Sequence, residues 1–271
     1  MCFCFEYTNP GKGFIKMAKK GKLKVQDFGY TMPVSDPAHC SPPFLYRGIE
    51  AFTIVYETDY ESAAQMLPEP LEFSTDPPVA GLMMSNLTFS NFGPYKEAIL
   101  MFNVIFKNKN YLYVPNLFVT QEDPLIGGRE IWGYAKKLAD MEFKKERNQI
   151  ISWVERPSGN RLFTATVSPE TNLKLEDWQN TDILSLKKIP SAEEGKQPDV
   201  CQLVGCEFKL TPILGSDGIA ELWRCKGSLT FDSRSRDDAW HRAPVVNILD
   251  AIYGWFNIHL PYGYLVHDYL A

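Results

Sequence analysis

The chain has 271 residues, of which 45% are hydrophobic and 13% aromatic, so it can bury a large core as one big domain or two small ones. With 28 Lys and Arg residues against 33 Asp and Glu residues, the formal net charge is -5, which excludes a general attraction to nucleic acid or to an anionic membrane. The composition therefore favours small-molecule chemistry.

Cysteine and histidine usage predicts mostly reduced thiols and no metal site. The six cysteines are too few and too scattered for a disulfide framework in a chain of this length. Cys2-x-Cys4 and Cys201-x4-Cys206 suggest metal-binding pairs, but no histidine or further cysteine stands at zinc-like spacing. No stretch approaches the roughly 20 apolar residues of a membrane span, and no basic segment precedes a long apolar run at the N-terminus. We therefore expect a cytoplasmic enzyme or binding protein.

The chain begins with a lysine-rich segment, residues 1–40, which we interpret as an N-terminal arm. Lysines alternate there with small residues at positions 12, 16, 19, 20, 22 and 24, and prolines follow at 33, 37, 42 and 43. This pattern is typical of a solvated tail that leads into an extended segment. We expect the remainder, residues 41–271, to form a single domain.

Short runs of β-branched and aromatic residues predict strands along the rest of the chain. They occupy residues 51–58, 99–107, 111–119, 150–156, 161–168, 203–214 and 220–231. The tripeptide at 108–110 predicts a hairpin turn, and the polar stretch 190–199 predicts a loop. Many strands with few helical patterns favour a mainly β, α+β chain with a large antiparallel sheet system, closed or sandwiched.

Three short segments carry helix signals. Residues 58–61 match a capping box, Thr followed three residues later by Glu, at the start of a helix that Pro68 stops. Asp123 and Pro124 place a capping side chain and then proline at the first helical position. Pro244 opens the third segment, "PVVNILDAIYGWF", whose apolar residues fall on one helical stripe.

Lys136 and Lys137 lie in a strongly apolar stretch, "EIWGYAKKLADMEF". A lysine in water has a pKa of about 10.4 and is almost fully protonated at neutral pH. Burial or a nearby positive charge lowers that pKa, and the free amine can then attack a carbonyl to form a Schiff base. Adjacent residues cannot share one face, so at most one of the two can point into a closed pocket. Residue type and spacing leave two interpretations open, a solvated pair whose stems pack on the core or one activated amine.

The string "GREIWGYAKKLA", residues 128–139, resembles the acetoacetate decarboxylase family. Its members carry Gly-Arg-Glu, a few residues later an aromatic residue, next usually a proline, and then two lysines. Four further stretches match in order, "AFTIVYETD", "LPEPLEF", "GPYKEA" and the closing segment 243–270. The resemblance covers most of the chain from about Tyr30 onward. It implies a closed, cone-like double antiparallel β-sheet with a few peripheral helices, a homo-oligomer and no cofactor.

The resemblance also implies roles for individual residues. Lys136 is expected to form the Schiff base, and Lys137 to be the neighbour linked with its lowered pKa. Glu97, in "GPYKEA", matches the family's active-site glutamate and is expected to orient the substrate, repel its carboxylate or handle a proton. A protonated imine at the β carbon accepts the electrons that remain when a β-keto acid loses CO2.

Two positions depart from the family pattern. Ile49 stands where the family's catalytic arginine is expected, and Ala135 replaces the usual proline before Lys136, which loosens φ there. Arg47 lies two residues before Ile49, which in an extended segment puts both on one face. Arg47 is then either a substitute guanidinium that binds the substrate or a surface charge.

These observations support three hypotheses about function. The first is a cofactor-independent decarboxylase that acts on acetoacetate or a related β-keto acid through a Schiff base on Lys136. The second is an aldolase or dehydratase type of lyase that acts on a larger keto acid, because Ile49 makes the pocket more apolar. The third is a non-catalytic member of the fold that binds a small ligand.

Overall fold

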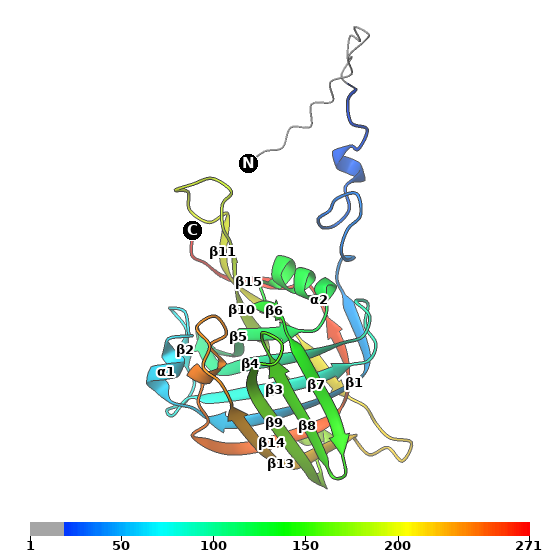
Figure 1. The fold of residues 1–271 in the computed structure, drawn as a ribbon, viewed down its shortest axis with the longest axis vertical. Coiled ribbons are helices and arrows are strands. Elements are labelled where there is room, and N and C mark those ends of the chain that lie inside the picture. Colours follow the sequence, from blue (N-terminus) through cyan, green and yellow to red (C-terminus); the bar gives the residue numbers. More distant parts are fainter. Residues whose placement is uncertain (1–18) are drawn as a thin grey trace.

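The structure is a computed structural model and describes residues 19–271 (Figure 1). The first part of the expected arm, with Cys2 and Cys4, lies outside the described residues. Residues 19–43 contain one short 3-10 helix, η1 (Val25–Asp27), before the first strand begins at Phe44. The division between an arm and a domain at residue 40 stays a prediction.

The fold is mainly β, as the sequence predicted. Its strands are β1 (Phe44–Glu57), β2 (Glu72–Phe73), β3 (Val79–Leu87), β4 (Tyr95–Phe106), β5 (Lys109–Val119), β6 (Lys136–Leu138), β7 (Asp140–Glu146), β8 (Gln149–Glu155), β9 (Arg161–Asn172), β10 (Ile183–Ile189), β11 (Val200–Cys206), β12 (Lys209–Pro212), β13 (Leu222–Phe231), β14 (Asn247–Leu260) and β15 (Tyr264–Asp268). Its helices are α1 (Tyr60–Ala64), α2 (Glu122–Gly127), the π-helix η2 (Gly128–Trp132) and the 3-10 turns η3 (Leu175–Asp177) and η4 (Trp240–Arg242).

The strands pair into one sheet in the order β15-β11-β10-β5-β4-β3-β1-β14-β13-β9-β8-β7, with β12, β2 and β6 attached to β14, β4 and β5. Most neighbours are antiparallel, but β5 pairs in parallel with both β10 and β6. The expectation of an entirely antiparallel double sheet is therefore wrong. The helices α2 and η2 form the crossover that parallel pairing of β5 and β6 requires. Closure of the sheet into a cone stays a prediction.

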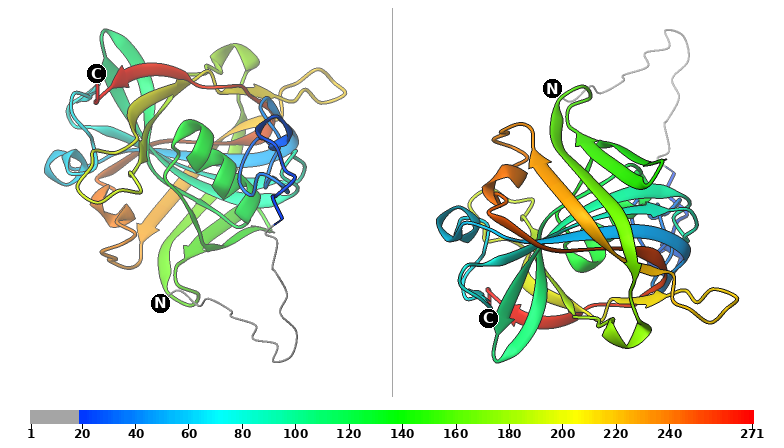
Figure 2. Two further views of the ribbon diagram at one scale, coloured as in Figure 1. Left: turned by 90° about the horizontal axis from the view of Figure 1, so that it is seen from above. Right: turned by 90° about the horizontal axis from the view of Figure 1, so that it is seen from below.

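The sheet curves strongly, so that β7, β8 and β9 lie across β1, β3 and β4 (Figures 1 and 2). Successive side chains of a strand point to opposite faces, and the two faces carry two apolar clusters. The first core includes Phe52, Leu100, Phe118, Phe163 and Trp240. The second core includes Ile49, Ile99, Leu117, Trp132 and Ile258. Neighbouring residues of one strand can thus belong to different cores.

The predicted strands are confirmed, with one division. Residues 203–214 form two strands, β11 and β12, which are separated at Glu207 and Phe208. The predicted hairpin joins β4 to β5, but its turn is Lys107-Asn108, one residue earlier than expected. Both turn residues have positive φ, 49° and 61°, which is the conformation that suits a two-residue hairpin.

The first two helix predictions are confirmed in position but not in their caps. Asp59 caps α1 in place of Thr58, because its carboxylate accepts a hydrogen bond from the Ser62 amide at 2.9 Å. The N-cap of α2 is Gln121, whose side chain makes no capping bond. Pro124 lies inside the first turn of that helix, where its missing N–H has no intrahelical partner to lose.

The third helix prediction, from Pro244 onward, is wrong. That segment runs into β14, which hydrogen-bonds to β1 along one edge and to β12 and β13 along the other. The β-branched and aromatic residues of this segment are compatible with a strand as well as with an amphipathic helix. Pairing with three other strands favours the strand.

Candidate active site

Strand β6 separates the environments of the two adjacent lysines. Lys136 lies beside Leu117 of β5, and Lys137 lies beside Phe118. Leu117 belongs to the second core and Phe118 to the first. Lys136 is consequently directed towards the second core and is only 5% exposed. The expectation that at most one lysine enters a closed pocket agrees with this arrangement.

The ammonium of Lys136 meets a buried carboxylate. Its Nζ donates to Oε2 of Glu97 at 2.9 Å, and Glu97 is only 8% exposed. Glu97 comes from β4, where it pairs with Val119 of β5, so the sheet register brings together two residues that are 39 apart in the chain. Desolvating two charges is costly, which makes this buried pair a candidate functional site.

A cavity of about 30 Å³ opens beside this pair. The charged residues of its lining are Lys136 and Glu97, and Tyr46 and Tyr134 are its other polar members. The remaining lining residues are Leu87, Ile99, Val114, Leu117, Ile183, Phe208, Ile258 and Leu260. At this size the space holds about one water molecule, so a carbonyl compound must widen it on entry and would then meet one amine and one carboxylate in apolar surroundings.

Three buried tyrosines surround the Lys136–Glu97 pair. The Tyr95 hydroxyl donates to the Tyr46 hydroxyl at 3.2 Å, and the Lys136 Nζ lies 5.8 Å from the ring centre of Tyr95 and 6.0 Å from that of Tyr134. Burial, with the nearby charge of Glu97 as a further cause, raises the pKa of all three phenols above the ordinary value. These hydroxyls therefore stay protonated well into the alkaline range.

The functional predictions from sequence did not include these tyrosines. A signal for one of them was present, because Tyr95 precedes Glu97 by two residues in β4, whereas Tyr134 lies before β6 begins. Residues two apart in a strand face the same side. No such spacing identifies Tyr46, because it lies on β1, which is separated from β4 in the sheet by β3.

The glycine-rich sequence before the lysines shapes the path of the Lys136 side chain. A Cβ at Gly128 would lie 2.6 Å from the Lys136 Cδ, so any other residue there would force the Lys136 side chain to shift. Arg129 donates from Nη1 to the Lys136 carbonyl oxygen at 3.2 Å. Gly133 ends η2 with φ of 79°, and a Cβ there would lie 2.3 Å from the Lys187 Cα. The segment is therefore fitted closely around Lys136.

Lys137 lies on the other side of β6. Its side chain is 38% exposed, and its Nζ contacts Asp238 Oδ1 at 2.8 Å and the Asp237 carbonyl oxygen. Arg156 shares the same Asp238 oxygen at 3.2 Å. The structure does not bring Lys137 to the cavity, and its role as a helper of Lys136 stays a prediction.

Arg47 lies on the surface, and its Nη1 donates to the Tyr46 carbonyl oxygen at 2.9 Å. The expectation that Arg47 and Ile49 share a face is wrong, because Ile49 is 0% exposed. A β-bulge between Tyr46 and Ile49, with Gly48 at φ of 61°, breaks the alternation of β1. Arg47 is not among the residues that line the cavity, and substrate binding by Arg47 stays a prediction.

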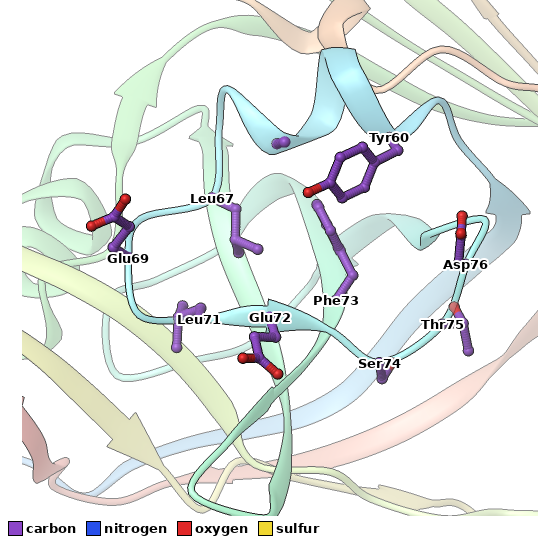
Figure 3. Close-up of a pocket in the computed structure, with 10 residues that line it drawn as sticks. Tyr60, Leu67, Glu69, Leu71, Glu72, Phe73, Ser74, Thr75 and Asp76 are labelled. Carbon is purple, nitrogen blue, oxygen red and sulfur yellow. The ribbon is translucent and has the colours of Figure 1, made fainter.

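The described residues offer no second site with comparable chemistry. A larger surface hollow, of about 820 Å³, lies beside α1 and β2 (Figure 3), but its lining includes no lysine, histidine or cysteine. Residues 19–271 contain no group of three or more His, Cys, Asp or Glu side chains that could hold a metal ion. Within the same residues, no helix has the length and hydropathy that crossing a bilayer requires.

Comparison with known proteins decides the family. The family model described as acetoacetate decarboxylase (ADC) matches residues 31–270. The chain belongs to the acetoacetate decarboxylase family. This membership confirms the resemblance found in the lysine motif and places the chain in a family of carboxy-lyases.

Relatives within the acetoacetate decarboxylase family are similar over most of their length. Decarboxylase DEC1 of Cochliobolus heterostrophus is 30% identical over 214 residues, which are 77% of this chain and 81% of that protein. Acetoacetate decarboxylase 2 of Mesorhizobium japonicum is 27% identical over 251 residues, 91% of this chain and 92% of that protein. The crystal structure of acetoacetate decarboxylase from Legionella pneumophila superposes with a TM-score of 0.80 at 25% identity, and covers 94% of this chain and 100% of that chain.

Proposed function

We propose that this protein decarboxylates a β-keto acid through a Schiff base on Lys136, and that acetoacetate is among its substrates. The observation that carries the proposal is the buried contact of 2.9 Å between Lys136 and Glu97 at an apolar cavity. The family supports the reaction type, and relatives named acetoacetate decarboxylase support the substrate.

The chemistry needs one amine and a route for one proton. The free amine of Lys136 attacks the keto carbon, and loss of water gives a protonated imine. The bond between C2 and the carboxylate then breaks, CO2 leaves, and its electron pair forms the C2=C3 double bond of an enamine while the imine nitrogen takes up the displaced pair. Protonation at C2 and hydrolysis of the imine release the ketone and regenerate the amine.

Glu97 is proposed to handle the proton. Its carboxylate is within hydrogen-bond reach of the Lys136 Nζ, which is the geometric condition for a general base. It takes the ammonium proton before the attack and can return a proton to C2 of the enamine. Of the three roles that the sequence left open, this one is supported by the contact.

The apolar lining is proposed to favour loss of CO2. A substrate carboxylate in the cavity would meet Glu97 and aliphatic side chains, with Lys136 as the cationic member of the lining. An anion is poorly solvated there, whereas CO2 and the enamine are neutral. The breaking of the C–C bond therefore removes a buried charge.

Release of CO2 from acetoacetate tests the proposal. We expect turnover by the wild-type chain and none above background by Lys136→Met, while Lys144→Met, a change at an exposed lysine, keeps wild-type activity. Wild-type turnover that survives in Lys136→Met would contradict the proposal.

An aldolase or dehydratase reaction is the second candidate. It is favoured by the buried Ile49 and the surface position of Arg47, which leave the cavity lining without a guanidinium to hold a carboxylate. Imine formation without CO2 release would favour this reaction. The homo-oligomeric state, the absence of a cofactor and the cytoplasmic location stay predictions.

A further inference from the structure

A second cavity, of about 160 Å³, borders the Lys136 cavity. The side chains of Ile183 and Phe208 line both spaces. Strand β5 also runs along both, with Leu117 and Val114 at the Lys136 cavity and Leu112 at the second. The second cavity thus adjoins the candidate active site, with Ile183 and Phe208 as their shared wall.

The second cavity is lined almost entirely by apolar groups. Its walls are Thr53, Val55, Met83, Met101, Leu112, Trp178, Gln179, Asn180, Thr181, Ile183, Phe208, Leu210 and Ile252. No member of this set carries a charge. Thr53, Val55 and Ile252 are partly exposed, so the cavity opens to solvent.

Hydrogen bonds hold the rim of the second cavity in place. The Asn180 side chain accepts from the Leu210 amide at 2.9 Å and donates to the Leu210 carbonyl oxygen at 3.2 Å. Trp178 donates from Nε1 to the same carbonyl oxygen at 3.0 Å, and its ring packs on Phe256 with centres 5.0 Å apart. The rim is therefore formed before a ligand arrives, which lowers the cost of binding one.

Gly81 of β3 lies against two lining residues of the second cavity, Met101 and Thr53. A Cβ there would lie 3.6 Å from the Met101 Cε and 3.7 Å from the Thr53 Cγ2, both at ordinary contact distance. A methyl group at this position would therefore press on these two lining residues without a clash. Met83 and Met101 beside it are flexible side chains that adapt to a ligand of variable shape.

We propose that the second cavity binds the apolar tail of the substrate, so that the preferred substrate is a medium-chain β-keto acid and not acetoacetate. The inference rests on the proposed function. The keto carbon forms the imine with Lys136, and the alkyl chain beyond it passes between Ile183 and Phe208. A cavity of about 150 Å³ admits a benzene-sized hydrocarbon, so tails of about four to six carbons fit. The products are CO2 and a methyl ketone.

A chain-length series tests the proposal. The kcat/KM for CO2 release is measured for acetoacetate, 3-oxohexanoate and 3-oxooctanoate. Each fully buried CH2 group raises kcat/KM by about fourfold, so the four extra CH2 groups of 3-oxooctanoate set a ceiling of about 250-fold over acetoacetate. We expect about 10- to 100-fold, because the cavity opens to solvent and the tail is not buried completely. A flat or falling series with active enzyme would overturn the role of the second cavity and leave the proposed function standing. Absence of CO2 release from every member would instead refute the proposed function.

Two variants that fill the second cavity sharpen the test. Met101→Trp is expected to lower kcat/KM for 3-oxooctanoate relative to acetoacetate by at least about tenfold. Gly81→Ala adds one methyl group without a clash and is expected to shift the same ratio by a few-fold. Val246→Trp, at a 63% exposed position away from both cavities, is the control, and circular dichroism verifies that each variant folds. An unchanged ratio in a folded Met101→Trp chain would overturn the proposal.

A binding measurement separates the cavity from the chemistry. The Lys136→Met variant is titrated calorimetrically with 2-heptanone, the product expected from 3-oxooctanoate, and with acetone. We expect 2-heptanone to bind at least about tenfold more tightly, and Met101→Trp in the same background to remove the difference. Equal affinities for the two ketones would contradict the proposal. Loss of self-association in Met101→Trp with a flat chain-length series would assign the cavity to a contact between copies and also overturn it.

Discussion

The two faces of β6 give two adjacent lysines opposite environments. Lys136 is buried against Glu97 in an apolar cavity, whereas Lys137 is partly exposed and shares Asp238 with Arg156. The residue type is the same, and the chain positions differ by one. The strand alternation places one amine where water is largely excluded and the other where its charge is paired near the surface.

This difference shows that the face of the strand on which a lysine lies determines whether its amine can act as a nucleophile. An amine that serves as a nucleophile needs a substrate space and a nearby acceptor for its proton, and in this arrangement Lys136 has both. Lys137 has an ion pair that fixes β6 to the segment before η4. The following predictions test how complete this division is, from the largest expected effect to the smallest.

Removing the buried amine should have the largest effect. Lys136→Met removes the nucleophile, and we expect kcat for CO2 release to fall by at least about 10⁴-fold. Steady-state kinetics on the purified variant measures this. Comparable losses in Lys136→Met and Lys137→Met would break the distinction between the two faces.

Replacing the buried carboxylate should have the next largest effect. Glu97→Gln keeps the size of the side chain but removes the proton acceptor, and we expect kcat to fall by about 10² to 10³-fold. Glu142→Gln is the matched control. Glu142 forms an ion pair with Lys96, which neighbours Glu97 in β4, but this pair is more exposed than the Lys136–Glu97 pair. If Glu97→Gln were no less active than Glu142→Gln, Glu97 would have no role in proton transfer.

Displacing the lysine without removing it should have a moderate effect. Gly128→Ala places a methyl group 2.6 Å from the Lys136 Cδ, so the side chain must shift, and we expect kcat to fall by about 10- to 100-fold. Gly21→Ala, where a Cβ meets no atom within 4 Å, is the control. Wild-type kcat in Gly128→Ala would show that the path of Lys136 tolerates displacement.

Changing the exposed lysine should affect folding more than catalysis. Lys137→Met leaves Asp238 with Arg156 as its charged partner, and we expect the free energy of unfolding to fall by about 1 to 3 kcal/mol. We expect kcat to fall by less than about tenfold, because the Lys137 charge is already paired on the other face. Urea denaturation and kinetics measure the two effects. A larger loss of kcat at unchanged stability would establish Lys137 as the electrostatic helper.

The sequence could predict those features that local pattern specifies. Strand runs such as 111–119 are recognisable from their β-branched and aromatic residues, and the lysine motif with Glu97 carries the family resemblance that the family model confirms. The alternation of a strand also implied that Lys136 and Lys137 face opposite sides. The register that joins Glu97 to Lys136 depends on three paired strands, and no single segment encodes it.

Features that depend on tertiary pairing could not be predicted in this way. The helical stripe after Pro244 gave way to β14, because pairing with β1 outweighs a weak local preference. The bulge at Gly48 separated Arg47 from Ile49, although simple alternation placed them together. The second cavity combines residues from seven elements and connecting segments, and its existence follows from the packing alone.

The buried tyrosines predict a loss of stability in alkaline solution. In the unfolded chain they ionise near pH 10, but burial raises the pKa of Tyr46, Tyr95 and Tyr134 in the folded chain. Above pH 10 the folded state therefore binds more protons, and stability falls as the pH rises. We expect a loss of about 1 kcal/mol per pH unit for each tyrosine. Urea denaturation at pH 8 and pH 11 measures it, with a smaller slope in Tyr46→Phe.

Trapping of the imine tests the central claim most directly. The wild-type chain is incubated with acetoacetate and, separately, with 3-oxooctanoate, reduced with borohydride while folded, and digested for peptide mapping. We predict a reduced adduct on Lys136 and an unmodified Lys137 in the same peptide. An adduct on Lys137, or the absence of any adduct on Lys136 while CO2 is released, would contradict the account.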